Sequence, residues 1–261
     1  MTMRDFVLTG QWFFLAYFVG INLGYLLQNV IAAHGIRRYL QTAEQYEAEN
    51  VFSALDIPVS VVVPAYNESA SIITSVKAML QLEYPQYELV VVNDGSSDDT
   101  LEKLIEAFDL KEFPEAYRAR VDCKPVRAVY RSTRISNLRV VDKENGGSKA
   151  DASNAGINAC RYPLVCVVDA DSVLQPDSLR RVVRPFLEDP TTVAVGGTVR
   201  ISNGCTVRQG FLEKVGLPRN FLALVQVVEY LRAFLFGRMG WSPINGLLII
   251  SGAFGVFHKE T

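Results

Sequence analysis

The sequence contains few of the residues from which metal centres and nucleophilic triads are built. Of its 261 residues only two are histidines, so a histidine-rich metal site or a Ser-His-Asp triad would have to use His34 or His258. His34 adjoins an apolar segment and His258 lies near the end of the chain, which favours ordinary surface or interface positions for both. The histidines therefore indicate neither kind of site.

Cysteine is also scarce. The four cysteines show neither the CxxC spacing of a zinc site nor the density of a disulfide framework. The pattern therefore predicts buried thiols in a reducing compartment, at Cys123, Cys160, Cys166 and Cys205.

The chain has no excess of positive charge. Lysine and arginine together number 26 and aspartate and glutamate 28, which gives a formal net charge of -2. Because a nucleic-acid-binding domain needs a basic surface, we expect no nucleic-acid partner. The length is sufficient for one large α/β domain with a well-developed core or for two small domains, and we expect one domain plus an appendage.

Charged residues are missing altogether from Phe6 to Ala33. About 20 apolar residues cross the hydrocarbon core of a bilayer, so this run predicts a transmembrane helix. A secretory signal would have a shorter apolar region between a basic start and a small-residue cleavage site, and the run does not resemble one. Arg37 and Arg38 follow it, which places the next domain on the cytoplasmic side by the positive-inside rule. The alternative is a long buried helix of a soluble protein.

Polar residues interrupt this apolar run at Gln11, Asn22 and Gln28. Such groups indicate packing against other membrane helices, for which a membrane partner subunit is one explanation. The segment from Gln41 to Asp56 is polar and reads as a linker. We therefore expect a transmembrane helix in residues 1–38, a linker in 39–57 and one domain in 58–261.

After the linker, short β-branched runs alternate with amphipathic stretches of helical period. Strands are predicted at Val59–Asn67, Glu88–Ser96, Leu138–Asn145, Leu164–Asp171 and Thr192–Val199. Helices are predicted at Ser69–Gln81, Asp98–Phe108, Lys149–Ala159 and Pro176–Glu188. Near-continuous apolar strands that alternate with helices imply an α/β fold, in which helices cover both faces of a mostly parallel sheet.

Polar motifs follow the first four predicted strands. They are PAYNE at residues 64–68, NDGS at 93–96, NGGSKA at 145–150 and DAD at 169–171. In such sheets ligands bind beyond the carboxyl ends of the strands. The motifs therefore predict one charged site of mixed sign that contains Asp94, Lys149, Asp169 and Asp171.

Asp169 and Asp171 are the best candidates for a metal site. Two carboxylates two positions apart at a strand end suit a divalent cation that also binds phosphate oxygens, because the ion makes their proximity tolerable. Magnesium or manganese held in this way would neutralise a leaving diphosphate. Alternatively, the carboxylates cap the next helix or form an Asx-turn.

Lys149 and Asp94 each admit two interpretations. Lys149 follows Gly146 and Gly147 at the start of a predicted helix, where a flexible backbone, a helix N-terminus and a cation could face a phosphate. The pattern is neither a Walker loop nor a GxGxxG fingerprint, so the motif is weak by itself. Asp94 could accept hydrogen bonds from a base or ribose, or serve as a turn residue in Asn-Asp-Gly-Ser.

Four ordered motifs carry a family resemblance: VVVPAYNE, VVVNDGSSDDT, ENGGSKADASNAG and VVDADS. They resemble the family 2 glycosyltransferases, inverting enzymes of the GT-A fold that use nucleotide-activated sugars. The resemblance extends from about Pro58 to the final residue. The preceding apolar helix and the Gly-Gly-x-Lys-Ala motif look like the processive synthases of cellulose, hyaluronan and poly-N-acetylglucosamine.

The resemblance implies a reaction and a place for it. A sugar would pass from UDP-N-acetylglucosamine or UDP-glucose to a growing polysaccharide at the inner or plasma membrane, with the catalytic domain in the cytoplasm. Uracil and ribose would be held by Tyr66, Glu68 and Asp94. Lys149 would contact the nucleotide or diphosphate, and Asp169 and Asp171 would be the DxD pair that binds the diphosphate and Mg²⁺ or Mn²⁺.

The C-terminal part of the chain supplies two more elements. Asn220–Trp241 has a long apolar face and is interpreted as a helix packed on the domain, or as an interfacial helix along the membrane. Asn245–Phe257 is interpreted as a strand followed by a glycine-rich turn. In the resembled synthases the corresponding Ser-Gly-x-Phe-Gly region lies beside the acceptor sugar, which implies an acceptor-side role for Ser251, Gly252 and Phe254.

The chain departs from the family pattern at the general base. An inverting transfer needs a base to deprotonate the acceptor hydroxyl, and the family's acidic Thr-Glu-Asp or Gly-Asp-Asp motif and its Gln-x-x-Arg-Trp motif are both absent. We therefore leave the catalytic base unassigned and expect the sequence to be a piece of a longer synthase. Two alternatives stay open: a donor-binding module without catalysis, and a nucleotidyltransferase, which should carry a Gly-rich basic signature after its first strand.

Overall fold

The computed structural model describes residues 3–48, 56–114, 119–208, 210–244, 246–247 and 249–260. The chain divides into two compact units. One, the helical unit, comprises residues 1–51 and 220–249, and the other, the sheet unit, comprises residues 52–219 and 250–261. This division groups residues 220–249 with the N-terminal segment, whereas the sequence analysis placed them in the domain that begins at residue 58.

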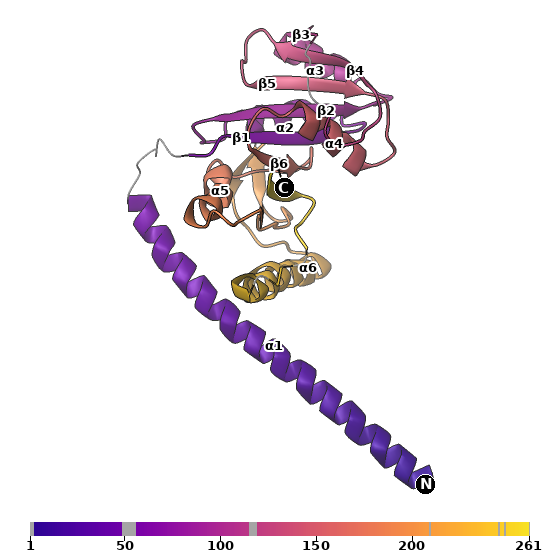
Figure 1. The fold of residues 1–261 in the computed structure, drawn as a ribbon, viewed down its shortest axis with the longest axis vertical. Coiled ribbons are helices and arrows are strands. Elements are labelled where there is room, and N and C mark those ends of the chain that lie inside the picture. The colour runs from indigo at the N-terminus through magenta and orange to yellow at the C-terminus, as the bar shows by residue number, and fades with distance from the viewer. Residues whose placement is uncertain are drawn as a thin grey trace. The chain divides into compact units, whose positions relative to one another are not determined.

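The sheet unit is built on eight strands in the order β3-β4-β5-β2-β1-β6-β10-β7. These strands are β1 (Val59–Ala65), β2 (Tyr87–Asp94), β3 (Leu110–Glu112), β4 (Val126–Ser132), β5 (Leu138–Lys143), β6 (Leu164–Val168), β7 (Ala194–Gly196) and β10 (Phe254–His258). Figure 1 labels β1 to β6 of this sheet. A separate two-stranded ribbon contains β8 (Thr206–Arg208) and β9 (Phe211–Lys214). The central strands β5, β2, β1 and β6 run parallel, as the apolar runs predicted.

Helices cover both faces of this sheet, which confirms the predicted α/β fold class. On one face, α2 (Ile72–Met79), α3 (Thr100–Phe108) and α5 (Ser178–Glu188) share a core with Val61 and Val63 of β1. On the other face, α4 (Lys149–Ala159) packs on Val62, because successive side chains of a strand point to opposite faces. The observed α4 has the bounds that the sequence predicted.

Glycine allows α4 to approach the sheet closely. A Cβ atom at Gly156 would lie 2.3 Å from Cγ1 of Val62 and 3.1 Å from Cγ2 of Val92. Both distances are shorter than van der Waals contact, so only glycine fits without displacement of these valines. This packing holds α4 directly against β1 and β2.

The last strand corrects the sequence analysis. Residues 245–257 were expected to form a strand and then a glycine-rich turn, but in the described part of this segment the turn precedes the strand, which begins at Phe254. β10 inserts antiparallel between β6 and β7 and hydrogen-bonds to both, which buries Phe254, Gly255 and Val256. Asn245 and Leu248 lie outside the described residues.

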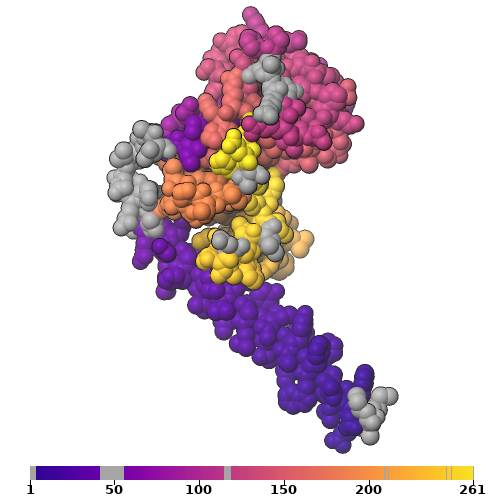
Figure 2. Space-filling model, viewed as in Figure 1, coloured from indigo at the N-terminus to yellow at the C-terminus, as the bar shows by residue number. Residues whose placement is uncertain are grey.

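The helical unit begins with α1 (Met3–Ala48). The helix continues past the boundary expected at residue 38, since the following residues are mostly good helix formers such as Ala, Glu, Gln and Leu. Its Arg4–Gln41 segment is long and apolar enough to cross a membrane, and it is the one such helix among the described residues. Apolar side chains along this helix are exposed at the surface, including Trp12, Phe13 and Leu27. Figure 2 draws the helix in indigo.

The other elements of the helical unit are α6 (Phe221–Leu231), the π-helix η1 (Arg232–Arg238), α7 (Met239–Trp241) and the 3₁₀ helix η2 (Ser242–Ile244). Small residues let α1 approach them closely. A Cβ atom at Gly240 would lie 2.5 Å from Cγ of Gln28, and Ala32 is fully buried. The side-chain amide of Gln28 donates to the carbonyl of Gly237 at 3.0 Å, so this polar residue of the apolar run does pair with another helix.

Candidate functional site

Four parallel strands bring the sequence-predicted residues to one edge of the sheet. β1 ends at Ala65, β2 at Asp94, β5 at Lys143 and β6 at Val168, and the four strands are neighbours. The segments that carry the polar motifs start from these ends. The order of motifs along the chain thus becomes a row of loops along the carboxyl edge of the sheet, which is where α/β sheets bind ligands.

Asp169 and Asp171 lie in a tight turn directly after β6. The backbone N–H of Ser172 donates to the carbonyl of Asp169 at 3.0 Å, which closes the turn. The Asp169 side chain is about one-third exposed (34%), and Asp171 is exposed. The next helix, α5, begins only at Ser178 with Asp177 as its N-cap residue, so neither carboxylate caps it. The helix-cap alternative is therefore wrong.

Lys149 joins two of the predicted site segments. Its ammonium pairs with Oδ1 of Asp169 and also donates to the carbonyl oxygen of Gly252 at 2.5 Å. The side chain of Lys149 is 40% exposed, so a solvent-borne anion can reach it. Lys149 is the first residue of α4, whose N-cap Ser148 accepts a hydrogen bond from the N–H of Asp151. A cation, a helix N-terminus and a carboxylate therefore meet at one place.

The donor set at this turn fits a divalent cation that shares its coordination with a ligand. Among the described residues, no group of three or more His, Cys, Asp or Glu side chains could hold a metal by itself. Mg²⁺ in proteins is commonly held by one or two carboxylates together with substrate phosphates, and Asp169 and Asp171 supply two carboxylates. The ammonium of Lys149 already lies against Asp169, which shows that a positive charge is accommodated at this carboxylate.

Tyr66 and Glu68 lie in the loop between β1 and α2. Tyr66 follows the last residue of β1, and its side chain is 51% exposed. Glu68 is half-buried, and its Oε2 accepts a hydrogen bond from the hydroxyl of Ser71, the N-cap residue of α2. Tyr66 is thus available to a ligand, whereas the carboxylate of Glu68 also orders the start of a helix.

The loops after β1 and β2 are hydrogen-bonded to each other. Asn67, which has a left-handed φ of 56°, accepts with its Oδ1 from the N–H of Ser97 at 2.8 Å. Asp98 accepts from the N–H of Ser69 at 3.2 Å and from the N–H of Thr100 at 3.1 Å. The hydrogen bond that the Thr100 hydroxyl donates to Oδ1 of Asp98, at 2.5 Å, is the main reason why the pKa of Asp98 is lowered. The segments that carry Tyr66 and Asp94 are therefore held in one arrangement.

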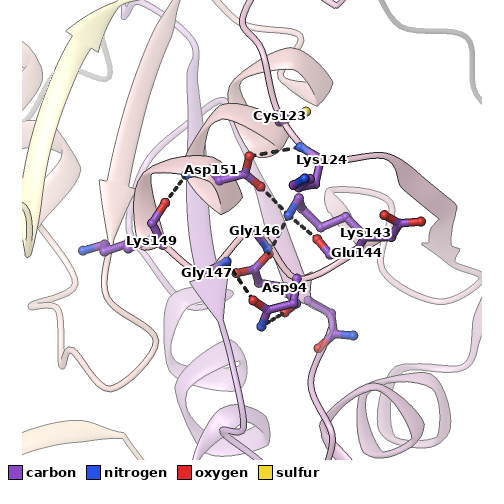
Figure 3. A network of polar contacts seen from close by, with 12 residues as sticks. Asp94, Cys123, Lys124, Lys143, Glu144, Gly146, Gly147, Lys149 and Asp151 are labelled. Atoms are coloured by element: carbon purple, nitrogen blue, oxygen red, sulfur yellow. Dashed lines mark hydrogen bonds and ion pairs between the residues drawn. The ribbon is translucent and has the colours of Figure 1, made fainter.

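Asp94 takes part in a buried charge network, shown in Figure 3. Its Oδ1 pairs with the Lys143 ammonium at 2.5 Å and accepts from the N–H of Gly146 at 3.1 Å. The same ammonium lies 2.5 Å from Oδ2 of Asp151 in the first turn of α4. Lys143 is fully buried, and the Asp94 side chain is 7% exposed. One cation thus connects the carboxyl ends of β2 and β5 with the first turn of α4.

The charges in this network stabilise one another. Burial alone would lower the pKa of Lys143, but the carboxylates of Asp151 and Asp94 outweigh burial and raise it. The ion pair with Lys143 lowers the pKa of Asp151. Lys143 therefore stays positively charged at neutral pH although water does not reach it.

Sequence reasoning missed Lys143 and Asp151. A signal for Lys143 was present, because it ends β5 in parallel register with Asp94, which ends β2. A lysine at the end of a buried strand needs a buried counter-charge, and the facing strand offers one. Strand order was needed to identify the partner.

Ser251, Gly252 and Phe254 lie in and after the turn that precedes β10. Gly252 reaches the site through its carbonyl oxygen, which accepts from Lys149. Phe254 is buried in the core beside Gly197, where a Cβ atom would lie 1.9 Å from Cδ1 of the ring. The acceptor-side role of these three residues stays a prediction, as do the donor-side roles of Tyr66, Glu68 and Asp94.

Comparison with known families identifies a match to most of the chain. The model of the family described as Glycosyl transferase family 2 matches residues 60–241, more than half of the sequence. This range includes the four loops at the carboxyl edge of the sheet.

Curated relatives also match most of the chain. Poly-beta-1,6-N-acetyl-D-glucosamine synthase of Staphylococcus epidermidis is 27% identical over 202 residues, which cover 77% of this chain and 40% of the relative. The protein of the same name from Staphylococcus aureus strain COL is 27% identical over 197 residues, which cover 75% of this chain and 38% of the relative. The chain thus spans about 40% of the length of the curated relatives it matches.

A solved structure shows the same fold. The mannosyltransferase PcManGT from Pyrobaculum calidifontis, in complex with GDP-Man and Mn²⁺, superposes with a TM-score of 0.51 at 20% identity. The alignment covers 90% of this chain and 56% of that chain. The GT-A fold expected from the resemblance is confirmed.

Proposed function

The chain belongs to glycosyl transferase family 2, and from this premise we propose that its sheet unit transfers a sugar from a UDP-sugar to a growing polysaccharide. The observation that supports this most directly is the meeting of Lys149, Asp169 and the N-terminus of α4 at the carboxyl edge of the sheet. A cation and a helix N-terminus attract phosphate, and the neighbouring carboxylates attract a metal ion that phosphate can share.

Different residues of the site bind different parts of the donor. Asp169 and Asp171 would hold Mg²⁺ or Mn²⁺, and the ion supplies positive charge that stabilises the leaving diphosphate. Lys149 contacts the diphosphate directly, and binding of the donor draws its ammonium away from Asp169. The exposed ring of Tyr66 and the carboxylates of Glu68 and Asp94 hold uracil and ribose.

The relatives support a choice of donor sugar and acceptor. Two relatives are named as poly-N-acetylglucosamine synthases, which supports UDP-N-acetylglucosamine as the donor and an N-acetylglucosamine polymer as the acceptor. UDP-glucose is the alternative donor. The acceptor would approach the turn formed by Ser251 and Gly252, whose carbonyl already contacts Lys149 at the diphosphate end. The transfer inverts the configuration of the sugar, as in the family resembled.

The first helix supports a membrane location for this chemistry. The apolar Arg4–Gln41 segment is long enough to cross a bilayer. Arg37 and Arg38 at its C-terminal end support a cytoplasmic position for the sheet unit. A transferase in this position can take its donor from the cytoplasm.

The direct test is sugar transfer by membranes that contain the full chain. With UDP-[¹⁴C]N-acetylglucosamine and Mn²⁺ or Mg²⁺, we expect release of UDP and incorporation of label into polymer, and neither with Asp171→Ala. Parallel reactions with UDP-glucose test the donor. Binding of UDP without release of sugar would instead assign the chain as a donor-binding module. Failure of the wild-type chain to bind UDP would contradict both assignments.

A further inference from the structure

We propose that Lys143 is a positioning residue of the nucleotide site, which holds the carboxylate of Asp94 charged and aimed at the nucleoside of the donor. The inference rests on the proposed function, because it assumes that the site binds a nucleoside diphosphate. Neither the family motifs nor the sequence analysis assigned Lys143 a role.

Burial and geometry support this assignment. Lys143 is fully buried, although it is the last residue of β5, where its partner in the strand register is Asp94, the last residue of β2. Its ammonium lies 2.5 Å from Oδ1 of Asp94, and the N–H of Gly146 donates to the same oxygen. Two donors on one oxygen fix the orientation of the carboxylate.

The network leaves little room for an alternative arrangement. A Cβ atom at Gly146 would lie 2.1 Å from Oδ2 of Asp151, so the loop after β5 passes directly over the ion pair. Asp151 also accepts from the N–H of Lys124 at 3.0 Å. Because both sides of the network are held, the ammonium of Lys143 cannot move far from Asp94 while α4 is in place.

A second buried ion pair on the same strands provides a comparison. Arg139 near the start of β5 pairs with Glu88 near the start of β2 at 2.6 Å, and both side chains are about 95% buried. Six positions of β2 separate Glu88 from Asp94, which corresponds to about 20 Å along the strand. The Arg139 pair lies at the amino ends of the strands, away from the candidate site. Both pairs stabilise the sheet, but only the Lys143 pair ends at a residue that faces the donor.

The proposal predicts a selective defect. Without Lys143, the Asp94 carboxylate is buried without its counter-charge, so it takes up a proton or turns towards solvent. In either case it no longer offers the nucleoside the same charged acceptor. A hydrogen bond to a charged group accounts for roughly 10-fold to 100-fold in affinity. The diphosphate end depends on Lys149, Asp169 and Asp171, so its affinity should remain.

The test compares UDP with inorganic pyrophosphate. Calorimetric titration of the full chain in detergent with Mn²⁺ gives both dissociation constants for wild type, Lys143→Met and the control Arg139→Met. We expect Lys143→Met to raise the dissociation constant for UDP at least 10-fold and to change that for pyrophosphate by no more than about twofold. Arg139→Met should leave both constants unchanged per folded molecule. In the transfer assay, Lys143→Met should raise the KM for the donor more than it lowers kcat.

A charge-balanced variant keeps the test valid if Lys143→Met does not fold. The double variant Lys143→Met/Asp151→Asn removes one cation and one anion. Its dissociation constants are compared with those of the single variant Asp151→Asn. The same selective loss of UDP affinity supports the proposal. Equal losses for UDP and pyrophosphate, or no loss of UDP affinity, would overturn it. If wild type binds neither ligand, the proposed function itself fails, and that outcome is distinct from binding that is insensitive to Lys143.

Discussion

Replacement of Arg139 by methionine should destabilise the sheet unit strongly. The guanidinium of Arg139 pairs with Glu88 at 2.6 Å and donates to the carbonyl of Ala159, at the end of α4, at 2.8 Å. Glu88 also accepts from the hydroxyl of Ser60 at 2.6 Å and from the N–H of Arg161 at 2.7 Å. Methionine keeps much of the volume of the side chain but leaves the buried Glu88 carboxylate without its counter-charge.

The expected size of the effect follows from the burial of both partners. Only 4% of the Arg139 side chain and 5% of the Glu88 side chain are exposed, so water screens the pair very little. Removal of one partner from such a pair costs about 3–5 kcal/mol. For a unit of this size, 1 kcal/mol corresponds to about 2–4 °C in Tm, so we expect a decrease of roughly 6–20 °C. Replacement of both residues by apolar side chains should recover most of this loss.

The prediction of four buried thiols is wrong for Cys123 and Cys205, which are partly exposed. The other two cysteines provide an assay that reports on the sheet unit. Cys160 and Cys166 are buried at the end of α4 and in β6, and burial raises the pKa of Cys160 to about 12. These thiols should react with a fluorogenic maleimide only when the unit unfolds. Both tryptophans, Trp12 and Trp241, lie in the helical unit, so their fluorescence reports on the other part of the chain. The reasoning would be refuted if Arg139→Met lowered Tm by less than about 2 °C. It would also be refuted if the variant with both Arg139 and Glu88 replaced were as unstable as Arg139→Met.

Three further predictions concern other parts of the chain. Gly197→Ala should displace the Phe254 ring, since the new Cβ would lie 1.9 Å from it. Polymer synthesis should then fall while UDP affinity is retained. Gly196→Ala should reduce synthesis less, because the atom nearest to its new Cβ is 3.3 Å away. Unchanged synthesis by Gly197→Ala would contradict this. Acid should destabilise the sheet unit through Asp151, whose pKa is lower in the folded state than in the unfolded state. Such a carboxylate stabilises the fold at a pH above its unfolded-state pKa of about 4. This contribution is lost as the pH falls through the folded-state pKa. The melting temperature of Asp151→Asn should therefore depend less on pH in that range, and an identical pH profile would reject the assignment. Finally, α1 should keep the chain in the membrane pellet during extraction with alkaline carbonate, and full release into the supernatant would show that it is not an anchor.

The parts of the fold that were predicted correctly depend on local patterns. The apolar runs of β1, β2, β5 and β6 reflect burial on both faces of the sheet, and each run carries that information by itself. The bounds of α4 were correct because Ser148 is an N-cap residue in the sequence as well as in the structure. Placement of the polar motifs at one edge followed from the parallel direction of these strands.

The parts that were missed depend on contacts between distant residues. β10 could not be placed from its sequence, because its position between β6 and β7 requires antiparallel pairing across more than 50 residues. For the same reason, the grouping of residues 220–249 with α1 could not be predicted from local sequence patterns. Lys143 shows the limit most clearly, since its partners Asp94 and Asp151 lie on two other elements.

The central claim is that Asp169 and Asp171 hold a divalent cation together with the diphosphate of a nucleotide. Its most direct test is titration of the full chain with UDP, with and without Mn²⁺, for wild type and Asp171→Ala. Asp177→Ala is a matched control, because Asp177 is a carboxylate in the same segment that pairs with Arg181. We predict that Mn²⁺ raises the affinity of wild type and Asp177→Ala for UDP and has no effect on Asp171→Ala. An undiminished effect of Mn²⁺ on Asp171→Ala would contradict the account.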